Sequence, residues 1–455
     1  MRTFELERAK TIFQKYRIKK IVWYPDYPEK THWTNPFKPE DFEQGLRNFY
    51  AQPTSLLYLH MPYCSRQCLF CNCKTVIVAN YWYVGTYLNW LYKEIELHLD
   101  FCRKNGISPH ISEVYFGGGS PSFMRQEDFA TLVDKIKPLT AFDSLSEVSL
   151  EIDPRHTKLH KMAFYRDMGV NRISFGIQDF DEEVQRAVDR IQPDFLIARL
   201  LAPKIRRMFP NGVNFDIMCG LPKQTRESFD RTLEKVIEFS PDRISLLTLN
   251  VTPVTASHQL LMPQDKIPSA LEVKVFLFDA IEKLTASGYI RTAFDHFAKP
   301  EDSVAKAKAE GKMAWGSFGS TAGRYQDVLG LGNSGISRLG PWHSAQNVYE
   351  VDTWKKLITV GRFPVLRMHL LSSDDIIRRD VTQWLRIYPC LRFVDIEEKH
   401  HINFKHYFAK ELDRLARLEE DGLVKMDANG FSMTEFGSLF ADFIAENFDA
   451  YVYPP

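Results

Sequence analysis

The chain has 455 residues, of which 44% are hydrophobic and 25% are charged, so it has enough apolar side chains for a core and lacks the composition of a disordered chain. Its 58 basic residues balance its 58 acidic ones, whereas a nucleic-acid-binding protein usually carries a basic excess. The first twenty residues contain no hydrophobic stretch, and no run of about 18 apolar residues follows. We therefore expect a cytoplasmic protein that binds neither nucleic acid nor membrane.

The first 50 residues form a leader whose middle, YPDYPEKTHWTNP, is too rich in proline for regular structure. Short runs of β-branched and aromatic residues then recur, and each is followed by a segment with apolar residues at three- and four-residue steps. The runs are 55–63, 112–120, 147–154, 172–180, 213–222 and 243–251. This alternation of strand and helix patterns predicts a parallel sheet.

Six such units predict a partial (β/α)6 barrel within the α/β class. Polar or glycine-rich residues lie at the C-terminal ends of the runs: Cys64, Gly117 to Gly119, Glu151, Asp153, Gln178, Asp216 and Asn250. In barrels of parallel strands this end carries the chemistry. We expect these residues to line one rim.

After residue 265 the alternation of strand and helix patterns ends. A glycine-rich stretch follows at 294–340, and the sequence after Pro364 has a strongly helical pattern. The segment GLVKMDANGFSMT predicts a hairpin around Asn429 and Gly430, giving a winged-helix-like end. We expect three domains: a leader over the active site (1–50), the barrel with the glycine-rich segment (51–340), and a smaller, mainly helical C-terminal domain (341–455).

Four of the seven cysteines lie within ten residues, at positions 64, 68, 71 and 73, in the pattern C-x3-C-x2-C-x-C. Three thiolates on one loop can hold three corners of a 4Fe-4S cluster and leave the fourth iron open. The alternative is zinc, but zinc motifs normally pair two separated knuckles, and no second cysteine knuckle follows. The pattern favours a cluster held by Cys64, Cys68 and Cys71, with the role of Cys73 left open.

The motif YLHMPYCSRQCLFCNCK resembles the radical S-adenosylmethionine (SAM) superfamily, and its last C-x-C resembles the oxygen-independent coproporphyrinogen III oxidase (dehydrogenase) family. The resemblance extends to GGGSPSFM, LEIDPR, RISFGIQDFDEEVQRAVDRIQ, FDIMCGLPKQT, DHFAKPED, LGLGNSGIS and RRD. It implies that the open iron of the cluster binds SAM, from which a 5′-deoxyadenosyl radical is generated in a dry cavity.

The resemblance also implies contacts to SAM at numbered positions of this chain. Tyr58 and Ile336 match positions that contact a first SAM, and Gly118, Gly119 and Ser120 are also expected to touch SAM. Glu151 is either a ligand of the amine or ribose of SAM, which the resemblance favours, or a paired charge at the rim. Phe70, Gln178, Arg190, Asp216 and Asn250 match positions that contact a second one. Asp153 is taken as structural, and His60 has no assigned role.

The implied activity is an oxidoreductase reaction in porphyrin and haem biosynthesis: oxidative decarboxylation of two propionates of coproporphyrinogen III to vinyl groups, giving protoporphyrinogen IX. A tetracarboxylate substrate needs cationic contacts, and Arg190 and Arg338 are candidates. The implied partners are this tetrapyrrole and a low-potential electron donor, with the chain acting as a monomer.

The chain departs from the family pattern at residues 22–28, where only the final Tyr-Pro is kept, and at 317–322. Two alternatives therefore stay open. One is a methyl- or methylene-transferase that uses two SAM molecules on another substrate. The other is a haem-binding chaperone, against which Cys73 and the full C-terminal region argue.

Overall fold

The computed structural model describes residues 3–18, 26–34, 36–140, 144–316, 318–322 and 327–453. Contacts divide the chain into two compact units. The barrel unit comprises Thr34–Ile267 and Arg324–Leu370, and the helical unit comprises Met1–Trp33, Pro268–Gly323 and Leu371–Pro455. Each unit joins stretches that are distant in sequence. The three domains expected from the sequence are consecutive ranges and stay a prediction. The departure at residues 22–25 lies outside the described residues.

The six predicted parallel strands are confirmed. They are β1 (Leu56–Met61), β4 (Glu113–Gly118), β5 (Glu147–Ile152), β6 (Arg172–Gln178), β7 (Val213–Cys219) and β8 (Arg243–Thr248). Each pairs in parallel with the next. All residues of β1 are buried, as expected for a strand that is covered on both faces.

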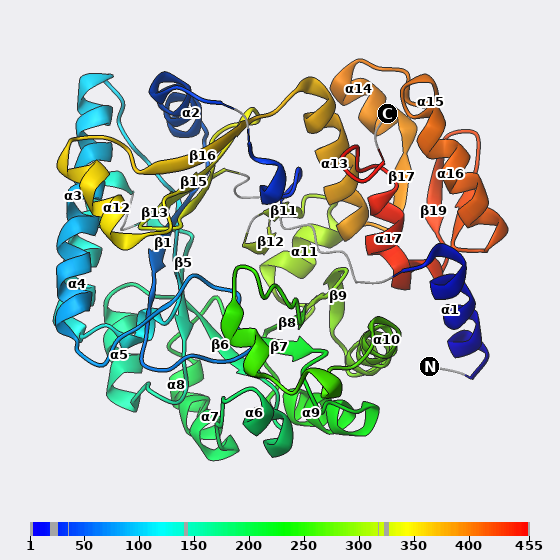
Figure 1. Ribbon diagram of the computed structural model, residues 1–455, viewed down its shortest axis with the longest axis horizontal. Coiled ribbons are helices and arrows are strands. Elements are labelled where there is room, and N and C mark those ends of the chain that lie inside the picture. The colour runs from blue at the N-terminus through cyan, green and yellow to red at the C-terminus, as the bar shows by residue number, and fades with distance from the viewer. Residues whose placement is uncertain are drawn as a thin grey trace. The chain divides into compact units, whose positions relative to one another are not determined.

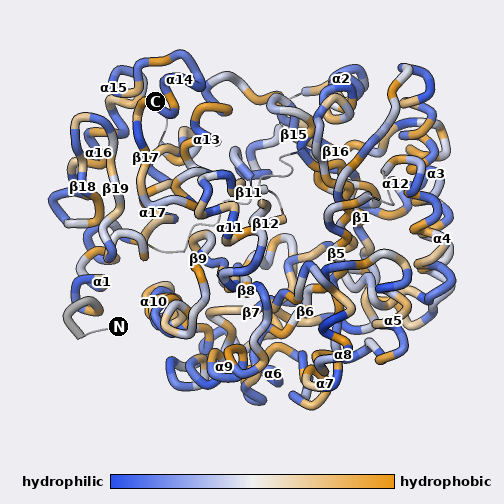
Figure 2. The backbone as a smooth tube through the Cα atoms, turned by 180° about the vertical axis from the view of Figure 1, so that it is seen from behind, coloured by the Kyte–Doolittle hydropathy of each residue, from blue (hydrophilic) through white to orange (hydrophobic). Residues whose placement is uncertain are grey.

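Helices follow these strands and cover the outer face of the sheet (Figure 1). They are α3 (Trp82–Lys104), α4 (Gln126–Ile136), α5 (Leu159–Asp167), α6 (Glu182–Ala187), α7 (Asp194–Leu200), α8 (Pro203–Arg206) and α9 (Arg226–Phe239). In α3 the buried side chains include Val84, Leu88, Leu91 and Ile95, one stripe of the helix. Figure 2 shows hydrophobic and hydrophilic residues alternating along these helices. The predicted α/β fold with a partial barrel is therefore confirmed.

The free edge of β1 carries a further parallel strand, β13 (Val328–Leu331), which the sequence analysis did not predict. The sheet continues in antiparallel order through β14 (Ile336–Arg338), β15 (His343–Asn347) and β16 (Val365–Leu370). Glycine permits the tight β13–β14 pairing, because a Cβ at Gly330 would lie 2.4 Å from the carbonyl oxygen of Ile336. Helices α2 (Pro39–Tyr50) and α12 (Val351–Thr359) also belong to this unit.

The helical unit contains the predicted hairpin, which is followed by α17 (Ala441–Glu446). Strands β18 (Val424–Met426) and β19 (Gly430–Met433) pair in antiparallel order, and β17 (Cys390–Arg392) joins β19. The other elements of this unit are α1 (Thr3–Tyr16), α10 (Ala270–Ala286), β9 (Ile290–Ala293), β10 (His296–Ala298), α11 (Ser303–Ala309), β11 (Ala314–Gly316), β12 (Gly319–Thr321), α13 (Ser373–Ile387), α14 (Phe393–His400), α15 (Phe404–Tyr407) and α16 (Ala409–Glu420). Among the described residues, no helix combines the length and apolar character needed to span a bilayer.

Candidate active site

The loop that carries the cysteines begins at β2 (Tyr63–Cys64) and closes at β3 (Val76–Ile77). These short strands pair in parallel with Cys64 opposite Ile77, and the N–H of Val78 donates to the Cys64 carbonyl at 3.1 Å. Cys68 and Cys71 lie between the two strands, and all three thiols are free. The structure therefore places the three predicted cluster cysteines on one closed loop.

Apolar side chains and two hydrogen bonds hold this loop. Cys68 and Phe70 are buried in a hydrophobic cluster with Val184, Val188, Met218, Leu221 and Met262. From the short 3-10 helix η5 (Ser257–Leu261), Gln259 Nε2 donates to the Phe70 carbonyl at 2.9 Å, and His258 Nε2 donates to the Cys71 carbonyl at 2.8 Å. The loop is thus fixed against a largely apolar wall, which keeps water from this side of it.

The glycines at the C-terminal end of β4 pack against the chain that enters the cysteine loop. The N–H of Gly119 donates to the Met61 carbonyl at 2.7 Å, and the N–H of Ser120 donates to the Tyr63 carbonyl at 3.1 Å. A Cβ at Gly119 would lie 2.9 Å from the backbone of Pro62. Gly118 has a φ of +112°, a conformation that favours glycine. The glycine run is therefore required for a close approach of two backbones beside the cysteines.

Glu151 lies at the C-terminal end of β5 and is held by two donors. Tyr115 Oη donates to its Oε1 at 3.0 Å, and the N–H of Gly118 donates to its Oε2 at 3.0 Å. Burial, and then the charge of Asp216, raise the pKa of Glu151 to about 8 despite these donors. A cationic ligand beside Glu151 would restore the ionised form.

Asp216 on β7 belongs to a polar network on the face of the sheet that also carries Glu151. Ser174 Oγ donates to its Oδ2 at 3.0 Å, and Asn214 Nδ2 donates to its Oδ1 at 2.8 Å. The strand register pairs Glu151 with Ser174 and Ser174 with Asn214, so these side chains share one face. This face of the sheet therefore carries the carboxyl groups of Glu151 and Asp216 next to the hydroxyl of Ser174 and the amide of Asn214.

Gln178 and Arg190 meet at an irregularity of β6. The pairing of β6 with β7 shifts between Gly176 and Gln178, and Gln178 has a φ of +71°. Arg190 donates through Nη2 to the Gly176 carbonyl and through Nη1 to Cys68 Sγ at 3.4 Å. Gln178 Oε1 and Arg190 Nε are buried and have no hydrogen-bond partner in the described part of the chain. These two unsatisfied atoms are groups that a polar ligand would satisfy.

The remaining predicted residues surround the same edge of the barrel unit. The Oη of Tyr58 on β1 lies 3.0 Å from His60 Nδ1. Gly330 on β13 lies between Tyr58 on one side, with which it is in register, and Ile336 on β14 on the other. Asn250 follows β8, and its carbonyl accepts from Asn72 Nδ2 at 2.7 Å. The side chain of Asn250 is exposed, so only its backbone is tied to the cysteine loop.

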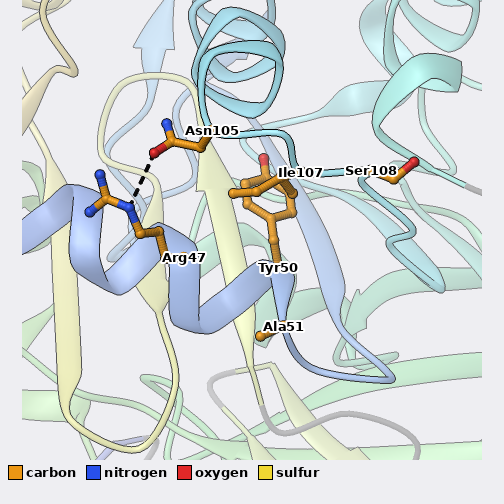
Figure 3. A pocket seen from close by; sticks show the side chains of 6 residues that line it. All are labelled: Arg47, Tyr50, Ala51, Asn105, Ile107 and Ser108. Atoms are coloured by element: carbon orange, nitrogen blue, oxygen red, sulfur yellow. Dashed lines mark hydrogen bonds between the residues drawn. The ribbon is translucent and has the colours of Figure 1, made fainter.

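The pocket drawn in Figure 3 lies elsewhere. It has a volume of about 430 Å³ and lies beside α2 and the segment that follows α3, where Arg47 Nε donates to Asn105 Oδ1 at 3.2 Å. Its lining residues are Arg47, Tyr50, Ala51, Asn105, Ile107 and Ser108, none of which is a predicted site residue.

Comparison with known proteins identifies the family. The model of the radical SAM superfamily matches residues 58–236. Oxygen-independent coproporphyrinogen III oxidase of Escherichia coli is 34% identical over 429 residues, which cover 94% of this chain and 92% of that protein. The chain belongs to the oxygen-independent coproporphyrinogen III oxidase family. The protein of the same name from Synechocystis is 33% identical over 98% of this chain and 96% of its own length.

A solved structure supports the same membership for this radical SAM protein. Coproporphyrinogen III oxidase from Escherichia coli, described as a radical SAM enzyme, superposes with a TM-score of 0.87 at 34% identity, covering 94% of this chain and 97% of that one. The sequence-based family assignment and fold class are confirmed. Membership implies a 4Fe-4S cluster and SAM as cofactors of a radical SAM oxidoreductase.

The residues of the cysteine loop fit such a cluster. Within the described ranges, no three thiol, imidazole or carboxylate groups converge as ligands of a single metal ion. A 4Fe-4S cube takes one thiolate at each of three corners, so its ligands need not converge on one point. Cys64, Cys68 and Cys71 would hold it, and the two hydrogen bonds from Arg155 and Arg190 to Cys68 Sγ suit a thiolate ligand.

Sequence reasoning missed Tyr115, Arg155, His258 and Gln259. Arg155 lies within LEIDPR, a motif that had been singled out without a role for its arginine. The other three carried no signal, because their partners Glu151, Cys71 and Phe70 are distant in the sequence. The assignments of individual residues to SAM contacts stay predictions.

Proposed function

We propose that this protein catalyses the oxygen-independent oxidative decarboxylation of coproporphyrinogen III to protoporphyrinogen IX in haem biosynthesis. Each of two propionates loses a hydrogen atom from its β-carbon, one electron and carbon dioxide, and a vinyl group remains. The observation that carries the proposal is the closed loop of Cys64, Cys68 and Cys71 beside Glu151, in a chain aligned over 94% of its length with enzymes of that name.

When bound, the cluster supplies the electron that cleaves a carbon–sulfur bond of SAM and gives a 5′-deoxyadenosyl radical. Glu151 would balance the positive charge of SAM, and the hydrogen bonds from Tyr115 and Gly118 fix the orientation of the Glu151 carboxylate. The apolar wall around Phe70 excludes water from the cluster side of the site.

We propose a second SAM position at Gln178 and Arg190, with Phe70, Asp216 and Asn250 nearby. The unsatisfied Gln178 Oε1 and Arg190 Nε support it, since buried polar atoms normally have partners. Gln178 is also held at positive φ at a strand irregularity, a conformation that is costly for a residue other than glycine.

Arg338 is the proposed contact to a substrate carboxylate. Its neighbour Leu339 faces Gly45 of α2, so Arg338, one residue earlier on β14, faces the side of the sheet away from that helix. The side chain is 5% exposed, and its Nε and Nη1 have no hydrogen-bond partner among the described residues. A buried guanidinium without an anion is unfavourable, and a propionate would supply the missing charge.

Anaerobic incubation of the cluster-loaded protein with SAM, a reductant and coproporphyrinogen III tests the proposal. Chromatography should show the tri- and dicarboxylate vinyl porphyrins. Formation of S-adenosylhomocysteine or methylthioadenosine without decarboxylation would instead indicate a methyl or methylene transferase. Haem binding without SAM cleavage would indicate a chaperone.

We also propose that a low-potential electron donor reduces the cluster and that the chain acts as a monomer in the cytoplasm. The balanced charge and the absence of a long apolar run in the sequence support the proposed location.

A further inference from the structure

Two arginines direct N–H groups at one cysteine of the cluster loop. Arg155 Nη2 lies 3.5 Å from Cys68 Sγ, and Arg190 Nη1 lies 3.4 Å from the same sulfur. In the described part of the chain, no arginine donates a hydrogen bond to the sulfur of Cys64 or Cys71. The three corners of the cluster site are therefore not equivalent.

Asp153 holds this arrangement together. Its carboxylate accepts from Arg155 Nε at 3.0 Å and Nη2 at 2.6 Å, and its Oδ1 also accepts from the N–H of Arg155 at 3.0 Å. The same carboxylate has its Oδ2 3.6 Å from Arg190 Nη1. Arg190 is fixed further by its bond to the Gly176 carbonyl. Asp153 thus orients both guanidinium groups.

The three charged side chains are nearly removed from solvent. The side chains of Arg155, Asp153 and Arg190 are 12%, 11% and 9% exposed. Their charges are therefore weakly screened by salt and water. The group of two cations and one anion leaves one net positive charge beside Cys68.

Hydrogen bonds and positive charge at a thiolate ligand favour the state of the cluster with more negative charge, which is the reduced state. We propose that Arg155, positioned by Asp153, acts with Arg190 through Cys68 to raise the reduction potential of the cluster. Arg155 is a positioning residue in this role, since it acts through a cluster ligand. The proposal rests on the cluster of the family and does not depend on the porphyrin reaction.

A purely structural role for Arg155 would predict a different outcome. Its bonds to Asp153 also close a turn after β5, so replacement could simply loosen that turn. Loosening would lower the iron content or the thermal stability without a defined change in potential. The test must therefore read the potential of the cluster that remains bound.

The experiment is a redox titration of the anaerobically reconstituted full chain, followed by the electron paramagnetic resonance signal of the reduced cluster. In Arg155→Met, the ratio of reduced to oxidised cluster at a fixed potential should fall about tenfold, equivalent to a midpoint about 59 mV more negative for one electron. Asp153→Asn should shift the midpoint in the opposite direction, because it removes the anion and keeps an acceptor. Opposite shifts at two neighbouring residues are not expected from loosening alone.

Arg66→Met is the matched control. Arg66 lies on the same loop, but its side chain is 62% exposed and its guanidinium binds Asp189. It should leave the midpoint unchanged. If Arg155→Met fails to hold iron, Arg155→Gln keeps a donor without the charge and should still shift the midpoint to more negative values. A cluster-loaded Arg155→Met or Arg155→Gln with the wild-type midpoint would overturn the proposal.

Discussion

Gly118 donates its backbone N–H to Oε2 of Glu151 at 3.0 Å, and this bond ties the glycine turn that begins at the end of β4 to the carboxylate near the C-terminal end of β5. The turn itself packs on Met61 and Pro62, which lead directly into the cysteine loop. One continuous set of contacts therefore joins Glu151, the carboxylate proposed to bind SAM, to the loop of the cluster ligands. Changes at either end of this set should alter SAM binding.

The affinity for SAM should depend on the ionisation of Glu151. Burial and Asp216 raise its pKa to about 8, so below pH 8 the carboxyl is mainly protonated and must lose its proton to bind a cation. Affinity should therefore rise about tenfold from pH 7 to pH 9 through this group. Equilibrium binding of SAM to the cluster-loaded protein measures it.

The amino group of SAM titrates in the same range and adds its own slope. Glu151→Gln should keep only that slope and bind more weakly at pH 9. Identical pH profiles for the two proteins would contradict the role given to Glu151.

Gly119→Ala should weaken SAM binding at least tenfold, or about 1.4 kcal/mol. Its Cβ would lie 2.9 Å from the Met61 carbonyl oxygen and the Pro62 backbone, so the turn must move. Overpacking of this kind also costs about 1–3 kcal/mol of folding stability. Gly85→Ala on α3 is the control, because its Cβ would meet nothing within 4 Å. It should be neutral or slightly stabilising, and equal SAM affinities for the two variants would count against the proposed turn.

Arg338→Met should raise the KM for coproporphyrinogen III about tenfold or more, since a hydrogen bond to a charged group is worth about 1.5–3 kcal/mol. The dissociation constant for SAM should stay at the wild-type value. The variant should also melt at an equal or higher temperature, because it removes a buried guanidinium with unsatisfied N–H groups. Steady-state kinetics and thermal melts check both effects. An unchanged KM would exclude Arg338 from substrate binding.

Glu94→Ala should destabilise the barrel unit by about 3–5 kcal/mol. The buried Glu94 carboxylate accepts from the N–H of Gly332 at 2.8 Å, Asn347 Nδ2 at 2.8 Å and Trp354 Nε1 at 3.1 Å. The Gly332 N–H and Trp354 Nε1 would lose this acceptor, whereas Asn347 Nδ2 would keep its bond to the Gly332 carbonyl at 2.9 Å. Glu96→Ala on the same helix is the control, because that side chain is 59% exposed and should change stability by no more than about 0.5 kcal/mol. Denaturant unfolding compares them, and equal stabilities would show that Glu94 is not a structural anchor.

The local parts of the site could be predicted from the sequence. Cys64, Cys68 and Cys71 are so close in the chain that their spacing alone indicates a shared ligand. The six parallel strands were predictable because each combines a short apolar run with a following amphipathic helix. In both cases the pattern depends on residues within about 30 positions of one another.

The missed parts depend on contacts between distant residues. Strands β13 and β14 were not predicted because Gly330, Gly332 and Gly335 make this segment resemble a loop, whereas Gly330 in fact allows two strands to approach closely. Arg155 shows the same limit, since its partner Cys68 lies 87 residues away. Strand pairing brings such distant residues together, and no pattern within a short stretch of sequence indicates which residues will meet.

The most direct measurement counts two products of one anaerobic reaction with SAM, a reductant and coproporphyrinogen III. We predict equal amounts of 5′-deoxyadenosine and carbon dioxide from the cluster-loaded protein. Cys71→Ala should form neither product, whereas Cys390→Ala, which changes an exposed cysteine of the helical unit, should match the wild type. SAM cleavage without carbon dioxide, or full activity of Cys71→Ala, would contradict the proposed function.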